Sequence, residues 1–213
     1  MFTGIIEATG SISSILTKGG DYQVTVKSGD LDLSDVNLGD SIATNGVCLT
    51  VVQLSDKSYV ADVSNETINN TNFANYQAGQ KVNLEKAMLP TTRFGGHMVS
   101  GHVDCTTQVA AIVDNGRAKD IWLNLPKDYA QYLVKKGSVT IDGISLTVND
   151  VNSSQFKLTI VPHTSSQTTL DALQVGGSVN LEVDLIARYV ERLITHKDQG
   201  VTMELLTKSG FIK

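Results

Sequence analysis

The sequence repeats itself at a fixed separation of 97 residues. Three blocks recur in this one register: residues 1–6 return at 98–103, residues 45–51 at 142–148, and residues 77–85 at 174–182. The second pair is Asn-Gly-Val-Cys-Leu-Thr-Val and Asp-Gly-Ile-Ser-Leu-Thr-Val. A period of this length corresponds to a whole domain rather than to the short unit of a solenoid. The chain is therefore predicted to contain two copies of one domain, with two similar pockets.

The composition is that of an ordinary globular protein. Of the 213 residues, 41% are hydrophobic and 18% are charged, which allows each copy a small core of its own. A net charge of −5 argues against a nucleic-acid partner, and no apolar run is long enough to predict a membrane span. The N-terminus lacks the pattern of a signal peptide, so we expect a cytoplasmic protein. In that compartment Cys48 and Cys105 are expected to be free thiols.

Short stretches of alternating polarity, rich in Val, Ile and Thr, make up most of each copy. Examples are residues 22–27, 48–53, 58–63 and 81–85. A period of two is typical of half-buried strands. About six such strands per copy, separated by Gly, Asn and Asp turns, predict an all-β fold with a small closed barrel in each copy.

Helical patterns are few. Hydroxyl residues that can cap a short helix begin residues 64–73 and 164–173. A third short helix is predicted over 128–136, ended by Gly137.

A tail follows the second copy and has no counterpart in the first. Apolar residues recur at helical spacing over 185–194, and a further short helix is predicted over 202–211. The apolar stripe either packs back on the barrels or serves self-association. Since the junction near 88–97 holds a proline and two adjacent glycines, we predict domains at 1–97 and 98–186. Residues 187–213 then form a helical tail for oligomerisation.

Cys48 stands at the start of a predicted strand where the second copy has Ser145. Taken alone, a cysteine in this position is usually a buried structural residue. Both copies, however, keep a small polar atom here, followed by Leu-Thr-Val. The Cys or Ser and the Thr lie on one face of the strand, and a polar face present in both copies is typical of a pocket wall.

His97 and His102 lie close to Asp104 and Cys105 in the sequence. These residue types can bind a metal, but their spacing fits no standard zinc pattern, so no metal site is predicted. His102 replaces Ile5 of the first copy. A titratable group at a position where two copies differ is a candidate for acid–base chemistry, with a structural histidine as the alternative. His97 faces the other side of an extended segment, and we expect it to matter less.

Hydroxyl-rich segments at 62–67 and 161–166 lie toward corresponding ends of the two copies. Helix capping explains them without any function. They also provide many short donors and acceptors, which suits the binding of a polyol chain. Gly4 and Gly101 match as well, and glycine lets a backbone approach a flat ring closely.

Five blocks in order, at residues 1–5, 45–51, 95–104, 142–148 and 184–193, together resemble the riboflavin synthase family, alpha-chain type. The resemblance runs from Met1 to the C-terminal Ser-Gly-Phe and departs at Cys105, where glycine is more usual. It implies two six-stranded Greek-key barrels and a C-terminal helix, through which three copies assemble as a homotrimer. It also implies a reaction without external cofactor. Each active site holds two molecules of 6,7-dimethyl-8-ribityllumazine, and one donates a four-carbon unit to the other, giving riboflavin and a ribitylaminopyrimidine.

The resemblance also implies which residues bind substrate. The first site is expected to contain Gly4, Ile5, Ile6, Cys48, Leu49, Thr50, Asp62, Val63, Ser64, Asn65, Glu66 and Thr67. The second is expected to contain Gly101, His102, Val103, Ser145, Leu146, Thr147, Val161, Pro162, His163, Thr164, Ser165 and Ser166. Lys136 is expected to reach across from a neighbouring subunit. The working site is expected where the first barrel of one subunit meets the second barrel of another.

The chemistry implied by the resemblance starts at the acidic 7-methyl group of one lumazine, and His102 is the candidate base. A nucleophile adds at C7 of the other lumazine, and Cys48, Ser41, water or a ribityl hydroxyl are all open candidates. A non-catalytic lumazine- or flavin-binding protein is the alternative, although both copies keep the Leu-Thr-Val motif. A flavin-reductase barrel would need a glycine-rich phosphate loop, and the sequence has no G-x-G-x-x-G.

Overall fold

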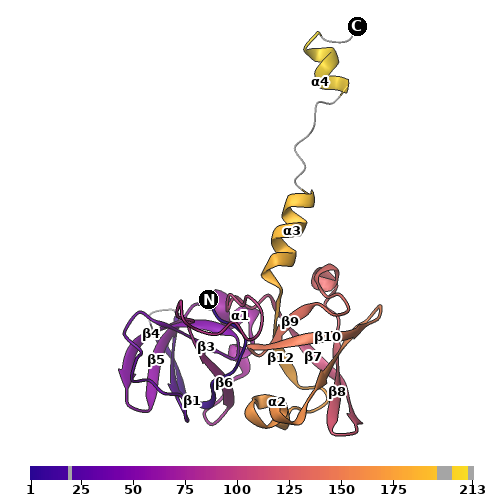
Figure 1. The fold of residues 1–213 in the computed structure, drawn as a ribbon. Helices are drawn as coiled ribbons and strands as arrows, with labels where there is room; N and C mark the ends of the chain where they lie inside the picture. Colours follow the sequence, from indigo (N-terminus) through magenta and orange to yellow (C-terminus); the bar gives the residue numbers. More distant parts are fainter. Residues whose placement is uncertain (19–20, 196–202, 211–213) are drawn as a thin grey trace.

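A computed structural model describes residues 1–18, 21–195 and 203–210. The first six strands are β1 (Ala8–Lys18), β2 (Asp21–Lys27), β3 (Ser41–Thr44), β4 (Val47–Ser55), β5 (Ser58–Val63) and β6 (Lys81–Lys86). The next six are β7 (Cys105–Asn115), β8 (Ala118–Asn124), β9 (Ser138–Ile141), β10 (Ile144–Val151), β11 (Gln155–Ile160) and β12 (Ser178–Val183). They form two closed antiparallel barrels that stand side by side (Figure 1).

The two barrels have the same topology. The strand order is β1-β2-β5-β4-β3-β6 in the first and β10-β11-β8-β7-β12-β9 in the second, which is the same circle displaced by six strands. Connections that skip a neighbour, such as β2 to β3, make each barrel a Greek key. Register shifts in β1, β4, β7 and β10 recur at equivalent places and help the short strands to curve and close. The predicted all-β fold of two six-stranded barrels is confirmed.

The hairpin turns before β4 and β10 hold the barrels against each other. Asn45 and Asp142 have φ of 46° and 45°, and a Cβ on Gly46 would lie 2.7 Å from the amide nitrogen of Gly143. The side chain of Asn83 donates to the Asp142 carbonyl at 2.9 Å. Equivalent bonds from the second barrel repeat this pattern. This interface fixes the relative position of the two copies.

The short helices follow the predicted segments with one difference. α1 (Asn65–Asn70) with η1 (Asn72–Asn75), and α2 (Pro162–Gln167) with η3 (Thr169–Ala172), occupy the two capped segments. The helix predicted over 128–136 is instead a 3-10 turn, η2 (Lys127–Tyr132). Lys136 has φ of 71° and donates its N–H to the Val148 carbonyl in β10. This left-handed residue is tied to the barrel and cannot continue a right-handed helix.

The tail begins with α3 (Leu185–Thr195), which leaves the barrels directly after β12 (Figure 1). The predicted helix over 185–194 is therefore confirmed, and it starts before the domain boundary that we predict after residue 186. α4 (Met203–Lys208) lies within the segment predicted as the last helix, whose ends at 202 and 211 lie outside the described residues. No helix in the described ranges is both long and apolar enough to cross a membrane.

One side of α3 contacts the second barrel and the other is open. Arg188 forms an ion pair with Asp104 and lies over the rings of Tyr129 and Tyr132, and the Tyr132 hydroxyl donates to Glu191. The apolar stripe is exposed and consists of Ile186, Tyr189, Val190, Leu193 and Ile194. In the single chain, the stripe therefore does not pack back on the barrels.

Candidate functional site

The segments that begin the two copies cross to each other's barrel. Phe2 and Val99 pair at the centre, each donating its N–H to the other's carbonyl at 2.8 and 3.1 Å. Farther along, Ile6 packs against the core of the second barrel and Val103 against the core of the first. Each barrel is therefore completed by a segment from the other copy.

Two glycines form the closest contacts of these crossing segments. The Gly101 carbonyl accepts a hydrogen bond from the Cys48 amide at 2.8 Å, and the Gly4 carbonyl accepts one from the Ser145 amide at 2.8 Å. A Cβ on Gly101 would lie 2.7 Å from the Cβ of Cys48, and one on Gly4 would lie 2.6 Å from the Cβ of Ser145. The grouping expected from the sequence is therefore wrong, because Gly4 lies at Ser145 and Gly101 lies at Cys48.

The first site is a cavity of about 250 Å³ at the end of the first barrel. Its wall consists of Val47, Cys48, Glu66, Thr67, Asn70, Thr71, Gly101, His102 and Val103. It thus combines residues expected in the first site with the 101–103 segment expected in the second. Asn70 and Thr71 were missed by the sequence analysis, although they continue the same polar segment.

Other residues expected in the first site surround this cavity without lining it. Leu49 and Val63 are buried in the barrel core, so their side chains face away from it. Thr50 is exposed on the outer face of β4. Asp62 is exposed and accepts a hydrogen bond from Gln23, and Ser64 caps α1 by accepting the N–H of Thr67 at 3.2 Å. Asn65 is the first residue of α1.

His97 contacts Ser145 of the candidate second site, which argues against the expectation that His97 matters less than His102. Its Nδ1 lies 2.7 Å from the Ser145 hydroxyl and its Nε2 lies 3.1 Å from the Thr140 hydroxyl. Burial lowers the pKa of His97, against a weaker opposing effect of Asp184. A neutral imidazole carries one donor and one acceptor nitrogen, which suits proton exchange with Ser145. Comparison of the two copies could not reveal the contact between His97 and Ser145. His97 directly precedes the repeated block, which begins at residue 98, and therefore has no counterpart in the first copy.

The remaining residues expected in the second site lie on β10 and on the segment that contains α2. Thr147, Val161, Pro162, His163 and Ser166 are exposed, while Leu146 and Thr164 are half-buried. Ile5, which is expected in the first site, is exposed as well. Ser165 is buried and donates to Asp171. Lys136 is exposed on the second barrel, and its expected reach to a neighbouring subunit stays a prediction.

A larger cavity of about 700 Å³ lies between the 88–95 linker and the first barrel. Ser41 and Ile5 are the candidate residues that line it, together with the charged side chains of Lys86 and Arg93. Ser41 pairs with Thr50, two positions from the Ala43–Cys48 pair, on the outer face of β3 and β4. Ser41 and Cys48 therefore share a face but line different cavities.

Both cysteines are free, as predicted. Cys48 is half-buried at the first site, whereas burial, with a smaller contribution from Asp128, raises the pKa of Cys105 to about 11. A thiol with so high a pKa is a poor nucleophile near neutral pH. In the described part of the chain, no three His, Cys, Asp or Glu side chains are grouped to hold a metal.

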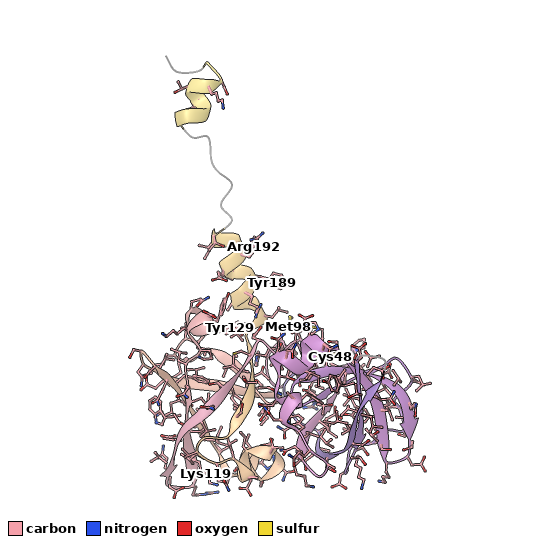
Figure 2. All side chains as sticks on the ribbon, turned by 180° about the vertical axis from the view of Figure 1, so that it is seen from behind. Cys48, Met98, Lys119, Tyr129, Tyr189 and Arg192 are labelled. Carbon is pink, nitrogen blue, oxygen red and sulfur yellow. The ribbon has the colours of Figure 1, made fainter. Side chains whose placement is uncertain are left out.

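The first site faces the side of the molecule from which α3 emerges (Figure 2). Figure 2 shows Cys48 and Met98 near the base of α3, with Tyr189 and Arg192 farther along the helix. Lys119 lies at the opposite end of the second barrel (Figure 2). The first site and the apolar stripe are therefore on the same side of the chain.

Comparisons with known proteins agree with this architecture. The family model described as the lumazine binding domain matches the chain twice, over residues 3–87 and 100–184. Riboflavin synthases of Photobacterium phosphoreum and Photobacterium leiognathi are 57% and 53% identical over 100% of both chains. That of Bacillus subtilis (strain 168) is 40% identical over 98% of this chain and 97% of its own.

Solved structures lead to the same fold. Crystal structures of LumP with 6,7-dimethyl-8-(1'-D-ribityl) lumazine and with riboflavin have TM-scores of 0.77 and 0.79 to this chain. Each is 25% identical and covers 86% of this chain and 99% of its own. With two matching domains and relatives of this identity along the whole length, the chain belongs to the riboflavin synthase family.

Proposed function

We propose that the chain is a riboflavin synthase, a transferase that catalyses the last step of riboflavin biosynthesis. It converts two molecules of 6,7-dimethyl-8-ribityllumazine into riboflavin and 5-amino-6-(D-ribitylamino)uracil by transfer of a four-carbon unit. The observation that carries this proposal is 57% identity to a riboflavin synthase over the full length of both chains. Two equivalent barrels in one chain suit a reaction between two identical substrates.

Lumazine binding at the first site is supported by its mixed surface. Gly101 and Val103 offer apolar groups for the ring, while Glu66, Thr67 and Asn70 offer polar groups for the ribityl chain. Pockets for small molecules usually combine apolar walls with a few polar groups that fix orientation. The LumP structures, which contain the lumazine and riboflavin, support the same class of ligand for this fold.

The proposed chemistry uses different groups at the two sites. His102 at the first site removes a proton from the 7-methyl group of its lumazine, whose carbanion is delocalised into the ring. At the second site Ser145 adds through its oxygen to C7 of the other lumazine while His97 takes the hydroxyl proton. Cys48, Ser41, water and a ribityl hydroxyl stay alternative nucleophiles. No external cofactor takes part.

Holding the two rings together is expected to be the largest contribution to rate. Proximity and orientation can supply about 7–11 kcal/mol. One acid–base group supplies a factor of about 10²–10⁴, equivalent to roughly 3–5 kcal/mol. Loss of a single side chain is therefore expected to slow turnover without abolishing it.

A homotrimer is the proposed assembly. The apolar stripe of α3 is exposed in the single chain, and burial against another subunit would remove it from water. α3 emerges on the side that carries Cys48 (Figure 2). Self-association through this stripe would bring the first barrel of one subunit toward the second barrel of another. Lys136 would then extend into the neighbouring site. The cytoplasm is the proposed location.

A turnover assay without additives tests the function. Purified chain is incubated with 6,7-dimethyl-8-ribityllumazine alone, and lumazine and riboflavin are quantified by chromatography. We expect one riboflavin to appear for every two lumazines consumed. LumP makes a binding-only protein the second candidate, and tight lumazine binding with no riboflavin formed would favour it.

A further inference from the structure

Two buried carboxylates hold the segments that cross between the barrels. Oε1 of Glu182 in β12 accepts the N–H and the hydroxyl of Ser100, both at 2.7 Å, and Oε2 accepts the N–H of Gly101 at 3.1 Å. Glu85 in β6 binds Thr3 in the same way at 2.7 Å and Gly4 at 3.0 Å. Each glutamate is only 4% exposed. The two anchors are equivalent in the two copies.

Each anchor is linked by a short path to the candidate site on the opposite barrel. From Glu182 the path runs through Gly101, whose carbonyl accepts the Cys48 N–H. The same anchor also fixes His102, because the His102 N–H donates to the Ser100 hydroxyl at 3.2 Å.

The path from Glu85 is the counterpart in the other copy. It runs through Gly4, whose carbonyl accepts the N–H of Ser145. The Ile5 N–H donates to the Thr3 hydroxyl at 3.2 Å, as His102 does to Ser100.

We propose that Glu182 is a positioning residue for the site at Cys48 and His102, and that Glu85 has the same role for the site at Ser145. The last strand of each barrel thus sets the geometry of the site on the other barrel. This inference deepens the proposed function and rests on it.

A purely stabilising role explains these glutamates less well. Removing a carboxylate from water is costly, and well-packed apolar residues often stabilise a core equally. A carboxylate that accepts three directed hydrogen bonds supplies orientation, and bonds to a charged acceptor are roughly twice as strong as neutral ones. Each carboxylate orients the glycine that contacts the site: Glu182 orients Gly101 at Cys48, and Glu85 orients Gly4 at Ser145.

The variants Glu182→Gln and Glu85→Gln form a matched pair. Glutamine keeps one carbonyl oxygen for the two Ser100 donors, but its NH₂ group then faces the N–H of Gly101. Two opposed donors push the segment away from Cys48. The same change at Glu85 disturbs Gly4 and leaves the Cys48 side intact.

Alkylation of Cys48 by iodoacetamide, followed by peptide mass spectrometry, reads out the position of Gly101. The rate of alkylation is proportional to the fraction of molecules in which the segment that contains Gly101 has moved away from Cys48. Glu182→Gln is expected to raise the Cys48 rate roughly tenfold, as for loss of one hydrogen bond to a buried charge. Glu85→Gln is expected to leave it unchanged, and Cys105 is the internal reference. Equal acceleration in both variants, or none in either, would overturn the proposal.

Riboflavin as the added ligand separates this inference from the proposed function. We expect riboflavin to protect Cys48 in the unmodified chain, and protection of Glu182→Gln to need roughly tenfold more riboflavin. If riboflavin never protects Cys48 while the two variants still differ in labelling, the proposed binding function fails and the positioning role stands. Ser100→Ala, with Thr3→Ala as its partner, repeats the comparison if Glu182→Gln does not fold. A Cys48 rate that is the same in these two alanine variants would also overturn the proposal.

Discussion

Replacing Gly101 with alanine should destabilise the protein and damage the first site. Gly101 has φ of 80°, a backbone conformation that costs a residue with a Cβ roughly 1–2 kcal/mol. The new Cβ would lie 2.7 Å from the Cβ of Cys48 and 2.8 Å from the Phe2 ring. Overpacking of this kind costs about 1–3 kcal/mol, and Phe2 is fully buried, so it cannot move aside freely. The free energy of unfolding should therefore fall by about 2–5 kcal/mol.

Gly176→Ala is the matched control. Gly176 has φ of 84°, but no atom lies within 4 Å of the position that its Cβ would take, so only the conformational cost of roughly 1–2 kcal/mol applies. Urea unfolding midpoints and slopes measure both variants, and titration with riboflavin should show weaker binding for Gly101→Ala alone. Equal loss of stability in the two variants would refute the argument, because it would mean that the contact with Cys48 costs nothing.

Five further variants test individual side chains and the tail. Cys48→Ser should lower steady-state turnover but leave it measurable, since the second copy has serine at the matching position; complete inactivity with intact lumazine binding would make the thiolate obligatory. His102→Gln should lower kcat about 10²–10⁴-fold with a smaller effect on lumazine affinity, and His97→Gln should have a similar effect because His97 contacts the serine of the second site; a normal rate for His97→Gln would contradict its proposed role. Removal of the chain from Leu185 onward should lower the oligomeric mass in light scattering, and an unchanged mass would exclude assembly through α3. Burial raises the pKa of Asp142 to about 7. The folded state then binds more protons than the unfolded state, so stability should fall as the pH rises from about 4 to 7. Asp142→Asn should flatten this dependence in urea titrations, and an unchanged slope would exclude Asp142 as its source.

The sequence predicted the architecture well because local patterns encode it. Alternating polarity marks the strands, and the Asn45-Gly46 and Asp142-Gly143 pairs adopt the positive φ that tight hairpins need. The apolar spacing in the tail likewise identified α3. The helix predicted over 128–136 was wrong near its end. The backbone hydrogen bond from Lys136 to β10 is a tertiary contact, which helix propensity does not include.

The crossing of the two segments could not be predicted for a different reason. Gly4 and Gly101 are equivalent, and so are the motifs at Cys48 and Ser145, so each glycine fits either motif equally well in sequence comparison. Which pair forms depends on how the barrels face each other across the Gly46–Gly143 contact. Glu85 and Glu182 did leave a signal in the third repeated block, as a charged residue kept at the same position in both copies.

The differences between the two copies bear on how one protein makes two identical molecules react in different ways. The common frame gives each site a crossing glycine and a buried glutamate. In the proposed function, this frame offers two lumazines equivalent positions. The groups that can exchange protons differ: the first site has His102 where the second has Ile5, and the second has the His97–Ser145 pair. A dismutation needs one substrate that loses a methyl proton and another that is attacked at C7. We infer that these differences assign the two roles, because the shared frame by itself would treat both substrates alike.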